Sequence, residues 1–192
     1  MEAGRLYHIY NRGNNRETIF KEEKNYIFFL ERFHKYLSPW VEVHAYCLMP
    51  NHFHLLIRIR DIEEPGMDLL TELTKAFRNF FASYAKAINH AYGRTGSLFQ
   101  YKFKRKEVTS EVQYGVNVAY IHFNPVKAKL TADCSSWRFS SFNAILSERP
   151  THVERASVLE WFGGRKALLD FHEQYWKYHL DREKDFKEFE ED

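Results

Sequence analysis

The hydrophobic residues of the chain recur at two different spacings, which divide the sequence into expected strands and helices. Apolar runs bounded by turn residues predict strands over residues 6–11, 41–48, 52–59 and 99–108. Apolar side chains at helical spacing predict helices over residues 22–37, 68–91 and 111–124. The last helix is expected to end at Asn124, because the residue before a proline disfavours the α conformation.

This order of elements predicts an α+β fold, a ferredoxin-like βαββαβ antiparallel sheet with two helices covering one face. The helix over residues 111–124 is an addition to that pattern, and residues 161–178 predict a C-terminal helical extension. We therefore expect a main domain over residues 1–146 and an extension over residues 147–180 that docks on it. Residues 181–192 are expected to form a flexible acidic tail.

The charge of the chain is small in total but unevenly distributed. The 192 residues have a formal net charge of +2, and residues 181–192 hold seven acids and three bases, a net of −4 that leaves +6 for the remainder. Acidic tails are usually solvated. The alternative is a tail that competes with a nucleic acid for a basic groove.

The composition indicates a globular protein with a core, since 44% of the residues are hydrophobic and 17% are aromatic. Such an aromatic excess fits either core packing or base stacking. Cys47 and Cys134 fit neither a disulfide framework nor a paired-cysteine metal site. The sequence shows no apolar signal core and no run of membrane-spanning length, so we expect a cytoplasmic protein without a membrane partner.

A pair of histidines lies on the strand expected over residues 52–59. Because side chains alternate along a strand, His52 and His54 share one face, while Phe53, Leu55 and Ile57 point to the other. The apolar set belongs against the helices, so the imidazoles are expected on the uncovered face. Two neighbouring imidazoles can chelate one cation. The alternative is two half-exposed histidines on a sheet surface.

The helix over residues 111–124 carries a candidate nucleophile. Asn117, Tyr120 and Asn124 fall on one face of this helix, which aligns a hydroxyl with two amides. The phenol of Tyr120 could attack phosphorus, and the amide oxygen of Asn124 could be a third metal ligand. The alternative is that Tyr120 is an ordinary core residue with a hydrogen-bonded hydroxyl.

Aromatic and basic residues are interleaved from Phe99 to Lys106, in the run FQYKFKRK. On a continuous strand, Tyr101 and Phe103 would share one face, and the lysines would share the other. Cations neutralise phosphates and rings accept stacked bases, which favours a nucleic-acid surface. A solvated edge strand with core-facing rings explains the same pattern.

Several segments together resemble the HUH tyrosine transposases, and more narrowly their REP-associated branch. These segments are LYHIYNRGNNR, AYCLMPNHFHLLI, GSLFQYKFK, YIHFNPVKAKL and WRFSS, in this order. The resemblance spans about residues 5–145 and implies that residues 1–146 form the catalytic domain. It also implies a single Mg²⁺ or Mn²⁺ bound by His52, His54 and Asn124, with Tyr120 as the nucleophile. Many members have glutamine where this chain has Asn124.

The resemblance implies cleavage and rejoining of single-stranded DNA beside a hairpin, through a 5′-phosphotyrosine, in a bacterial, nucleoid-associated protein. The candidates for DNA contacts are Arg12, Lys102, Lys104 and Arg105. Both a monomer and a homodimer fit the sequence. Three other interpretations stay open: a non-catalytic nucleic-acid-binding module on the same fold, another HUH nuclease such as a relaxase or replication initiator, and a former transposase that is no longer mobile.

Overall fold

The computed structural model describes residues 1–62 and 65–180, and the predicted acidic tail, residues 181–192, lies outside them. The strands are β1 (Leu6–Arg12), β2 (Val41–Met49), β3 (His52–Ile59) and β4 (Lys104–Val108). A short 3-10 helix, η1 (Asn14–Arg16), follows β1. The α-helices are α1 (Glu23–Leu37), α2 (Leu69–Ala91), α3 (Glu111–Lys127), α4 (Phe142–Leu146), α5 (Arg155–Phe162) and α6 (Arg165–Leu180).

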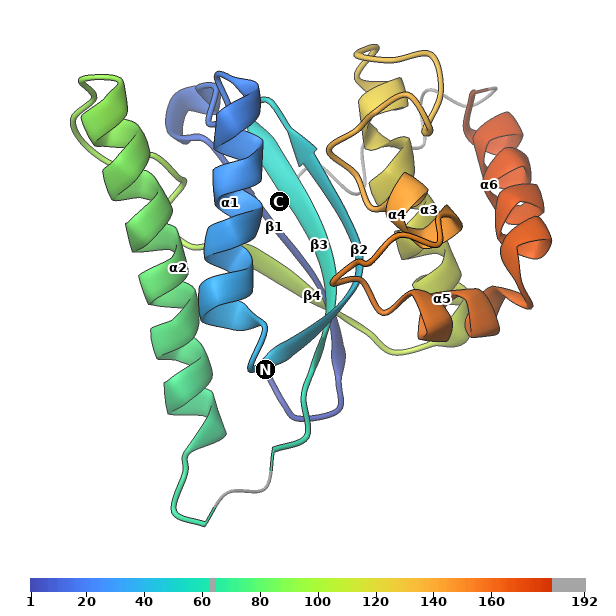
Figure 1. Ribbon diagram of the computed structural model, residues 1–192, viewed down its shortest axis with the longest axis horizontal. Helices are drawn as coiled ribbons and strands as arrows, with labels where there is room; N and C mark the ends of the chain where they lie inside the picture. Colours follow the sequence, from blue (N-terminus) through green and yellow to red (C-terminus); the bar gives the residue numbers. More distant parts are fainter. Residues whose placement is uncertain (63–64, 181–192) are drawn as a thin grey trace.

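Among the described residues, the strands form one sheet in the order β2-β3-β1-β4, and every neighbouring pair is antiparallel. The predicted α+β, ferredoxin-like architecture is therefore confirmed. The first strand lies between β3 and β4, so strands from three parts of the sequence far apart along the chain lie next to each other (Figure 1). β4 is an edge strand, and it is exposed along much of its length.

Helices cover both faces of the sheet (Figure 1). On one side, α1 and α2 pack against Phe53, Leu55 and Ile57 of β3, as the alternation predicted. On the other side, α3 packs against β2 and β3, and α5 and α6 complete the layer. The expectation that the histidine-bearing face is uncovered was wrong. Ala45, Cys47 and Leu56 give that face an apolar surface that α3 and the C-terminal helices bury.

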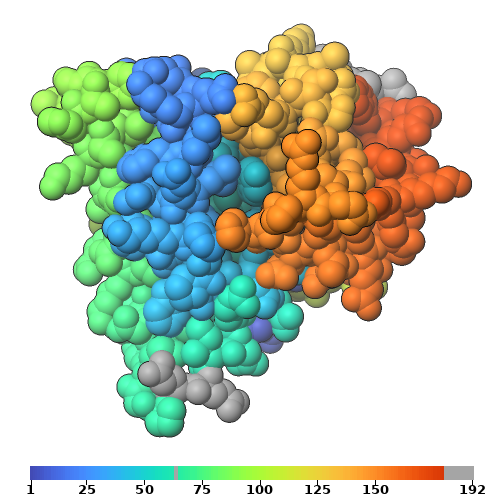
Figure 2. All heavy atoms as spheres, in the orientation of Figure 1, coloured from blue at the N-terminus to red at the C-terminus, as the bar shows by residue number. Residues whose placement is uncertain are grey.

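The segment between α4 and α5 contacts both helix α1 and the sheet. In Figure 2 the orange loop before α5 reaches the blue α1, and there the rings of His152 and His34 stack with centroids 3.9 Å apart. Val153 also bridges to Val43 on the outer edge of β2. The segment that follows residue 146 thus packs on the sheet and on α1. The domain boundary at residue 146 stays a prediction.

Three local features differ from a simple extension of the sequence patterns. Helix α3 does not end at Asn124 but continues through Pro125 to Lys127. β2 has an irregularity in its register between Val43 and Ala45, so Val41 and Ala45 join the cores on opposite faces of the sheet. The last strand begins at Lys104 rather than near residue 99, and the residues before it form a loop.

Candidate active site

The first element of the candidate site is a group of rings on the α3 side of the sheet. β3 contributes His54, and the register of β1 places Tyr10 directly opposite it. His8 lies two residues before Tyr10, and its Nε2 is 3.0 Å from Nδ1 of His54. Because His8 and His54 are only 4% and 6% exposed, this contact is shielded from water and fixes how the His54 ring is turned.

His52 lies closer to solvent at the start of β3 and is half-buried. Its Nδ1 is 2.7 Å from Oδ1 of Asn51. An amide oxygen only accepts hydrogen bonds, so the ring donates from Nδ1, and the lone pair of the neutral ring lies on Nε2. The Asn51–His52 pair therefore sets the tautomer in which Nε2 can coordinate a metal.

Burial holds the deeper imidazoles in their neutral form. Desolvation, followed by the charge of Lys106, lowers the pKa of His8 to about 3. Desolvation, followed by the neighbouring His8 and His52, lowers the pKa of His54 well below its usual value. A neutral imidazole retains the lone pair that a metal requires, so His54 is ready for coordination at physiological pH.

Helix α3 places Tyr120 against these imidazoles. The ring centroid of Tyr120 lies 5.4 Å from that of His54 and 5.9 Å from that of His8, with both contacts edge-on. Tyr120 is only 3% exposed. The helix starts where predicted, because the Ser110 hydroxyl accepts a 3.2 Å hydrogen bond from the backbone N–H of Gln113. A phenol and two imidazoles from three separate elements thus meet within one subunit.

Asn124 lies one turn further along α3 and is 4% exposed. Its Nδ2 donates a 2.9 Å hydrogen bond to the backbone carbonyl of Tyr120, which fixes the orientation of the amide. A cavity of about 230 Å³ adjoins it, lined by Met49, His52, Asn124, Lys127 and Ala128. His52 and Asn124 therefore face a shared space. Asn117 instead donates to the Gln113 carbonyl of its own helix, at 2.7 Å.

The cations predicted to contact DNA divide between two sides of the sheet. Arg12 lies opposite His52 and Lys104 lies opposite Tyr10, and directly paired residues share a face. Both therefore belong to the imidazole side. Lys102 and Arg105 instead line a separate cavity beside α2. The run FQYKFKRK, which looked continuous in the sequence, thus contributes cations to two different surfaces.

Sequence reasoning did not assign roles to His8, Tyr10 or Lys127. The first two follow from strand alternation, because His8 and Tyr10 share a face of β1 just as His52 and His54 share a face of β3. That signal becomes useful only once the pairing of β1 with β3 is known. Lys127 could not be placed beside the site, since the helix was expected to end before it.

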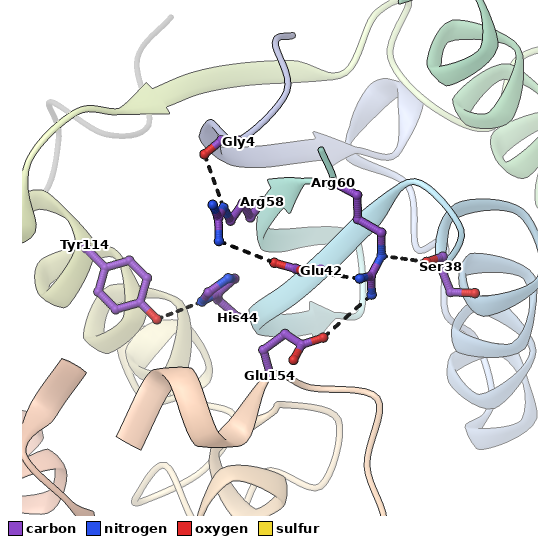
Figure 3. Close-up of polar contacts among 8 residues, drawn as sticks. All are labelled: Gly4, Ser38, Glu42, His44, Arg58, Arg60, Tyr114 and Glu154. Atoms are coloured by element: carbon purple, nitrogen blue, oxygen red, sulfur yellow. Dashed lines mark hydrogen bonds and ion pairs between the residues drawn. The ribbon is translucent and has the colours of Figure 1, made fainter. Parts of the chain in front are cut away.

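A second tyrosine–histidine pair lies near the opposite end of α3 (Figure 3). The Tyr114 hydroxyl lies 2.9 Å from Nδ1 of His44, and burial lowers the pKa of His44 to about 4. Nearby, Arg60 forms ion pairs with Glu42 and Glu154 and so connects β2 to the start of α5. This network holds the start of α3 and α5 on the sheet and is separate from the histidine pair of β3.

Within residues 1–62 and 65–180, no three His, Cys, Asp or Glu side chains gather in a way that could hold a metal ion. The donors that face the 230 Å³ cavity are instead the imidazole of His52 and the amide of Asn124, and His54 lies next to His52 on the same face of β3. Such a mixed nitrogen and oxygen set suits a divalent transition metal such as Mn²⁺.

A ferredoxin-like sheet with paired histidines on a central strand, faced by a tyrosine on an added helix, defines the HUH tyrosine transposase class. The family model described as IS200-like transposase matches residues 4–124, and the chain belongs to this family. The resemblance seen in the sequence is thus confirmed. None of the described helices is both long and apolar enough to cross a lipid bilayer.

One solved structure supports the same fold, and two more distant ones also match. A REP-associated tyrosine transposase bound to a REP hairpin matches with a TM-score of 0.56 and 21% identity, over 78% of this chain and 84% of that one. A candidate transposase from Deinococcus radiodurans has 18% identity and a TM-score of 0.38, over 60% of this chain and 92% of that one. A bacterial tRNA(His) guanylyltransferase-like protein with GTP has 9% identity and a TM-score of 0.39, over 67% and 69%. A search of curated proteins found no match.

Proposed function

We propose that this protein is a metal-dependent transposase that cleaves and rejoins single-stranded DNA, with Tyr120 as the nucleophile. The observation that carries the proposal is the contact of the Tyr120 ring with His54 and His8, at 5.4 and 5.9 Å between centroids. These residues are far apart in sequence, and their convergence is the arrangement that the chemistry requires.

The metal site proposed here consists of Nε2 of His52, Nε2 of His54 and Oδ1 of Asn124. Asn51 and His8 hold the two rings, each through Nδ1, at 2.7 and 3.0 Å. The hydrogen bond from Asn124 to the Tyr120 carbonyl holds the amide. A divalent cation at this position would polarise a non-bridging oxygen of the scissile phosphate. Mn²⁺ fits the donors well, and Mg²⁺ is the alternative.

The proposed reaction exchanges one phosphodiester for another. The Tyr120 oxygen attacks phosphorus, the bond from phosphorus to the 3′ oxygen breaks, and that oxygen takes up a proton. The products are a 5′-phosphotyrosine and a free 3′-OH. Attack by a 3′-OH on the phosphotyrosine reverses the step and joins strands. Because the bond broken and the bond formed are similar in kind, no nucleotide cofactor is required.

The proposed DNA substrate contains a hairpin. The structurally similar REP-associated transposase is bound to a REP hairpin. In this chain, Arg12, Lys104 and Lys127 lie on the imidazole side and would neutralise the phosphates of a strand entering the site. Since Tyr120 meets His54 of its own chain, a single subunit suffices to assemble the site, and we propose that the active unit is a monomer.

Tyr120→Phe tests the assignment of the nucleophile. Labelled single-stranded DNA carrying a hairpin is incubated with protein and Mn²⁺, and the covalent adduct is resolved on a denaturing gel. The variant should form no detectable adduct but should bind the DNA as the wild type does, because only the hydroxyl is lost. Tyr114→Phe is the matched control on the same helix and should retain the adduct. Adduct formation by Tyr120→Phe would refute the assignment.

One observation favours a second candidate function, a non-catalytic nucleic-acid-binding module. Tyr120 is 3% exposed and is not among the residues that line the 230 Å³ cavity. The phenol therefore offers little surface to a phosphate in this structure. Under this alternative, wild-type protein binds hairpin DNA but forms no adduct with either Mn²⁺ or Mg²⁺.

A further inference from the structure

A second surface suited to nucleic acid lies on the other side of the sheet from the imidazoles. Between α2 and residues 96–105 is a cavity of about 670 Å³, here called the α2 groove. Its floor is formed by aromatic rings, with Phe77 and Phe81 from α2 and Phe99 and Phe103 from the loop. The ring of Phe103 stacks on that of Phe77 with centroids 4.9 Å apart.

Tyr101 is the exposed ring at this groove. Phe99 and Phe103 pack toward the core, and Tyr101 between them is 88% exposed. The Nζ of Lys102 lies 5.5 Å from the centroid of the Tyr101 ring. The sequence predicted that Tyr101 and Phe103 would share a face, but this segment is a loop rather than a strand, and Tyr101 is directed away from the core. An exposed ring beside a cation is the usual platform for an unpaired base.

The charge around the groove is positive. Arg78 of α2 lines it together with Lys102 and Arg105, and none of the lining residues within 1–62 and 65–180 is acidic. Within the described part of the chain, neither Arg78 nor Arg105 forms an ion pair with an acidic side chain. Guanidinium groups that have no acidic partner in the protein favour the binding of a polyanion. They would add nothing to the binding of a purely apolar peptide.

The α2 groove and the candidate active site share the edge strand β4. Arg105 lines the groove, whereas Lys104 and Lys106 pair with Tyr10 and His8 on the imidazole side. The strand order leaves the outer edge of β4 unpaired by another strand of the described sheet. A nucleic-acid strand that crosses this edge would meet cations on both sides of it.

We propose that the α2 groove binds an unpaired base of the DNA substrate, stacked on Tyr101, with the adjoining phosphates on Arg78, Lys102 and Arg105. This inference rests on the proposed function, since it assumes that the substrate is DNA with a single-stranded segment next to the hairpin. It adds a recognition site remote from the cleaved phosphate, through which the unpaired segment contributes to affinity.

Fluorescence anisotropy tests the proposal with two labelled probes, a blunt DNA hairpin and the same hairpin with a single-stranded overhang. Tyr101→Ala should weaken binding of the overhang probe about tenfold, which is the usual effect of losing one stacked base. Binding of the blunt hairpin should not change. Tyr101→Phe, the matched control, keeps the ring and should bind both probes as the wild type does.

A scan of abasic nucleotides through the overhang identifies the bound base. One abasic position should reproduce the tenfold loss in wild type and should have no further effect in Tyr101→Ala. The proposal is overturned if Tyr101→Ala weakens both probes equally or neither. It is also overturned if light scattering shows that the variant changes the oligomeric state, since the groove would then be a surface between copies of this chain.

The two proposals fail independently. Anisotropy measured without divalent metal detects binding alone, so its outcome does not depend on whether Tyr120 cleaves DNA. Absence of a wild-type adduct would remove the transposase proposal but leave overhang binding to be judged by its own titration. Because Tyr101 is exposed, the variants should unfold at the wild-type temperature, and this is checked by thermal melting.

Discussion

His8 lies where a single side chain can control the geometry of a metal ligand. Its Nε2 is 3.0 Å from Nδ1 of His54, inside a site from which water is excluded. If His54 coordinates through Nε2, its Nδ1–H must donate to His8, and loss of that acceptor releases the ring. Replacing a side chain that hydrogen-bonds to a metal ligand typically lowers the metal affinity by about 10- to 100-fold.

His8→Leu should therefore weaken Mn²⁺ binding by about 10- to 100-fold, as measured by calorimetric titration. His8→Gln should restore much of the affinity, because the amide oxygen can accept the same hydrogen bond. Hairpin binding measured without metal should be unchanged in both variants. Equal metal affinity for the leucine and glutamine variants would show that His8 only fills space.

At the scale of elements, the sequence predicted which segments form the site but not how each of them ends. The pattern around Pro125 indicated a helix end, yet α3 continues to Lys127. A proline removes the hydrogen bond of its own missing N–H and crowds the carbonyl one turn before it, but the bonds beyond it can still form, and Ala128 donates to the Asn124 carbonyl at 2.9 Å. Packing of Ile121 and Phe123 in the core holds the helix together across the proline.

The irregularity in β2 and the loop before β4 were beyond prediction for a related reason. A strict period of two cannot show that β2 changes register between Val43 and Ala45, because either side of the change looks like a normal strand. Likewise, FQYKFKRK fits a strand, but continuous pairing with β1 begins only at Lys104, after an isolated bridge from Phe99 to Gly13. Local patterns predict an element, while its limits depend on what it pairs with.

Gly115 fixes how closely α3 and α5 approach. A Cβ at this position would lie 2.5 Å from Cη2 and 2.8 Å from Cζ3 of Trp161. Alanine favours a helix interior by about 1 kcal/mol over glycine. The clash with a rigid indole costs about 1–3 kcal/mol, however, and should win. Gly115→Ala should thus lower the free energy of unfolding by up to about 2 kcal/mol in urea titrations.

Trp161→Leu provides the check on that prediction, because it removes the ring that the new methyl group meets. In the Trp161→Leu background, Gly115→Ala should be neutral or stabilising, so the two substitutions should be non-additive. Strictly additive effects would show that Gly115 is required for a reason other than its contact with Trp161.

At the scale of the whole molecule, the histidine pair of β3 and the tyrosine of α3 were predictable, but the burial of the candidate site was not. The spacing of His52 and His54 and the position of Tyr120 on its helix came from the sequence alone. The low exposure of His54 arises because α3 covers its face of the sheet, with α5 and α6 behind it. That burial is a property of the assembled layers, since no strand pattern encodes which helices will cover it.

The same burial predicts how the stability of the whole protein depends on pH. Among the described residues, five histidines are less than a tenth exposed and have lowered pKa values: His8, His44, His54, His122 and His172. Burial is the main cause in each case, and it lowers the pKa of His172 to about 4. His122 and His172 lie 2.9 Å apart between α3 and α6, so acidification acts directly on that contact.

The unfolded chain takes up protons near pH ~6.5, whereas the folded state resists protonation down to the lowered pKa. Stability should therefore be greatest above pH ~6.5 and should fall as the pH decreases toward about 4. Each of these histidines lowers the free energy of unfolding by about 2 kcal/mol by pH ~5. The five together therefore lower it by an amount close to the total stability of a typical domain. Thermal melts followed by circular dichroism should show a steep loss of stability between pH ~7 and ~5.

His172→Gln should reduce that loss by about 2 kcal/mol, while replacement of the exposed His90 by glutamine should not. A melting temperature that is the same at both pH values would contradict the burial of these histidines as neutral groups.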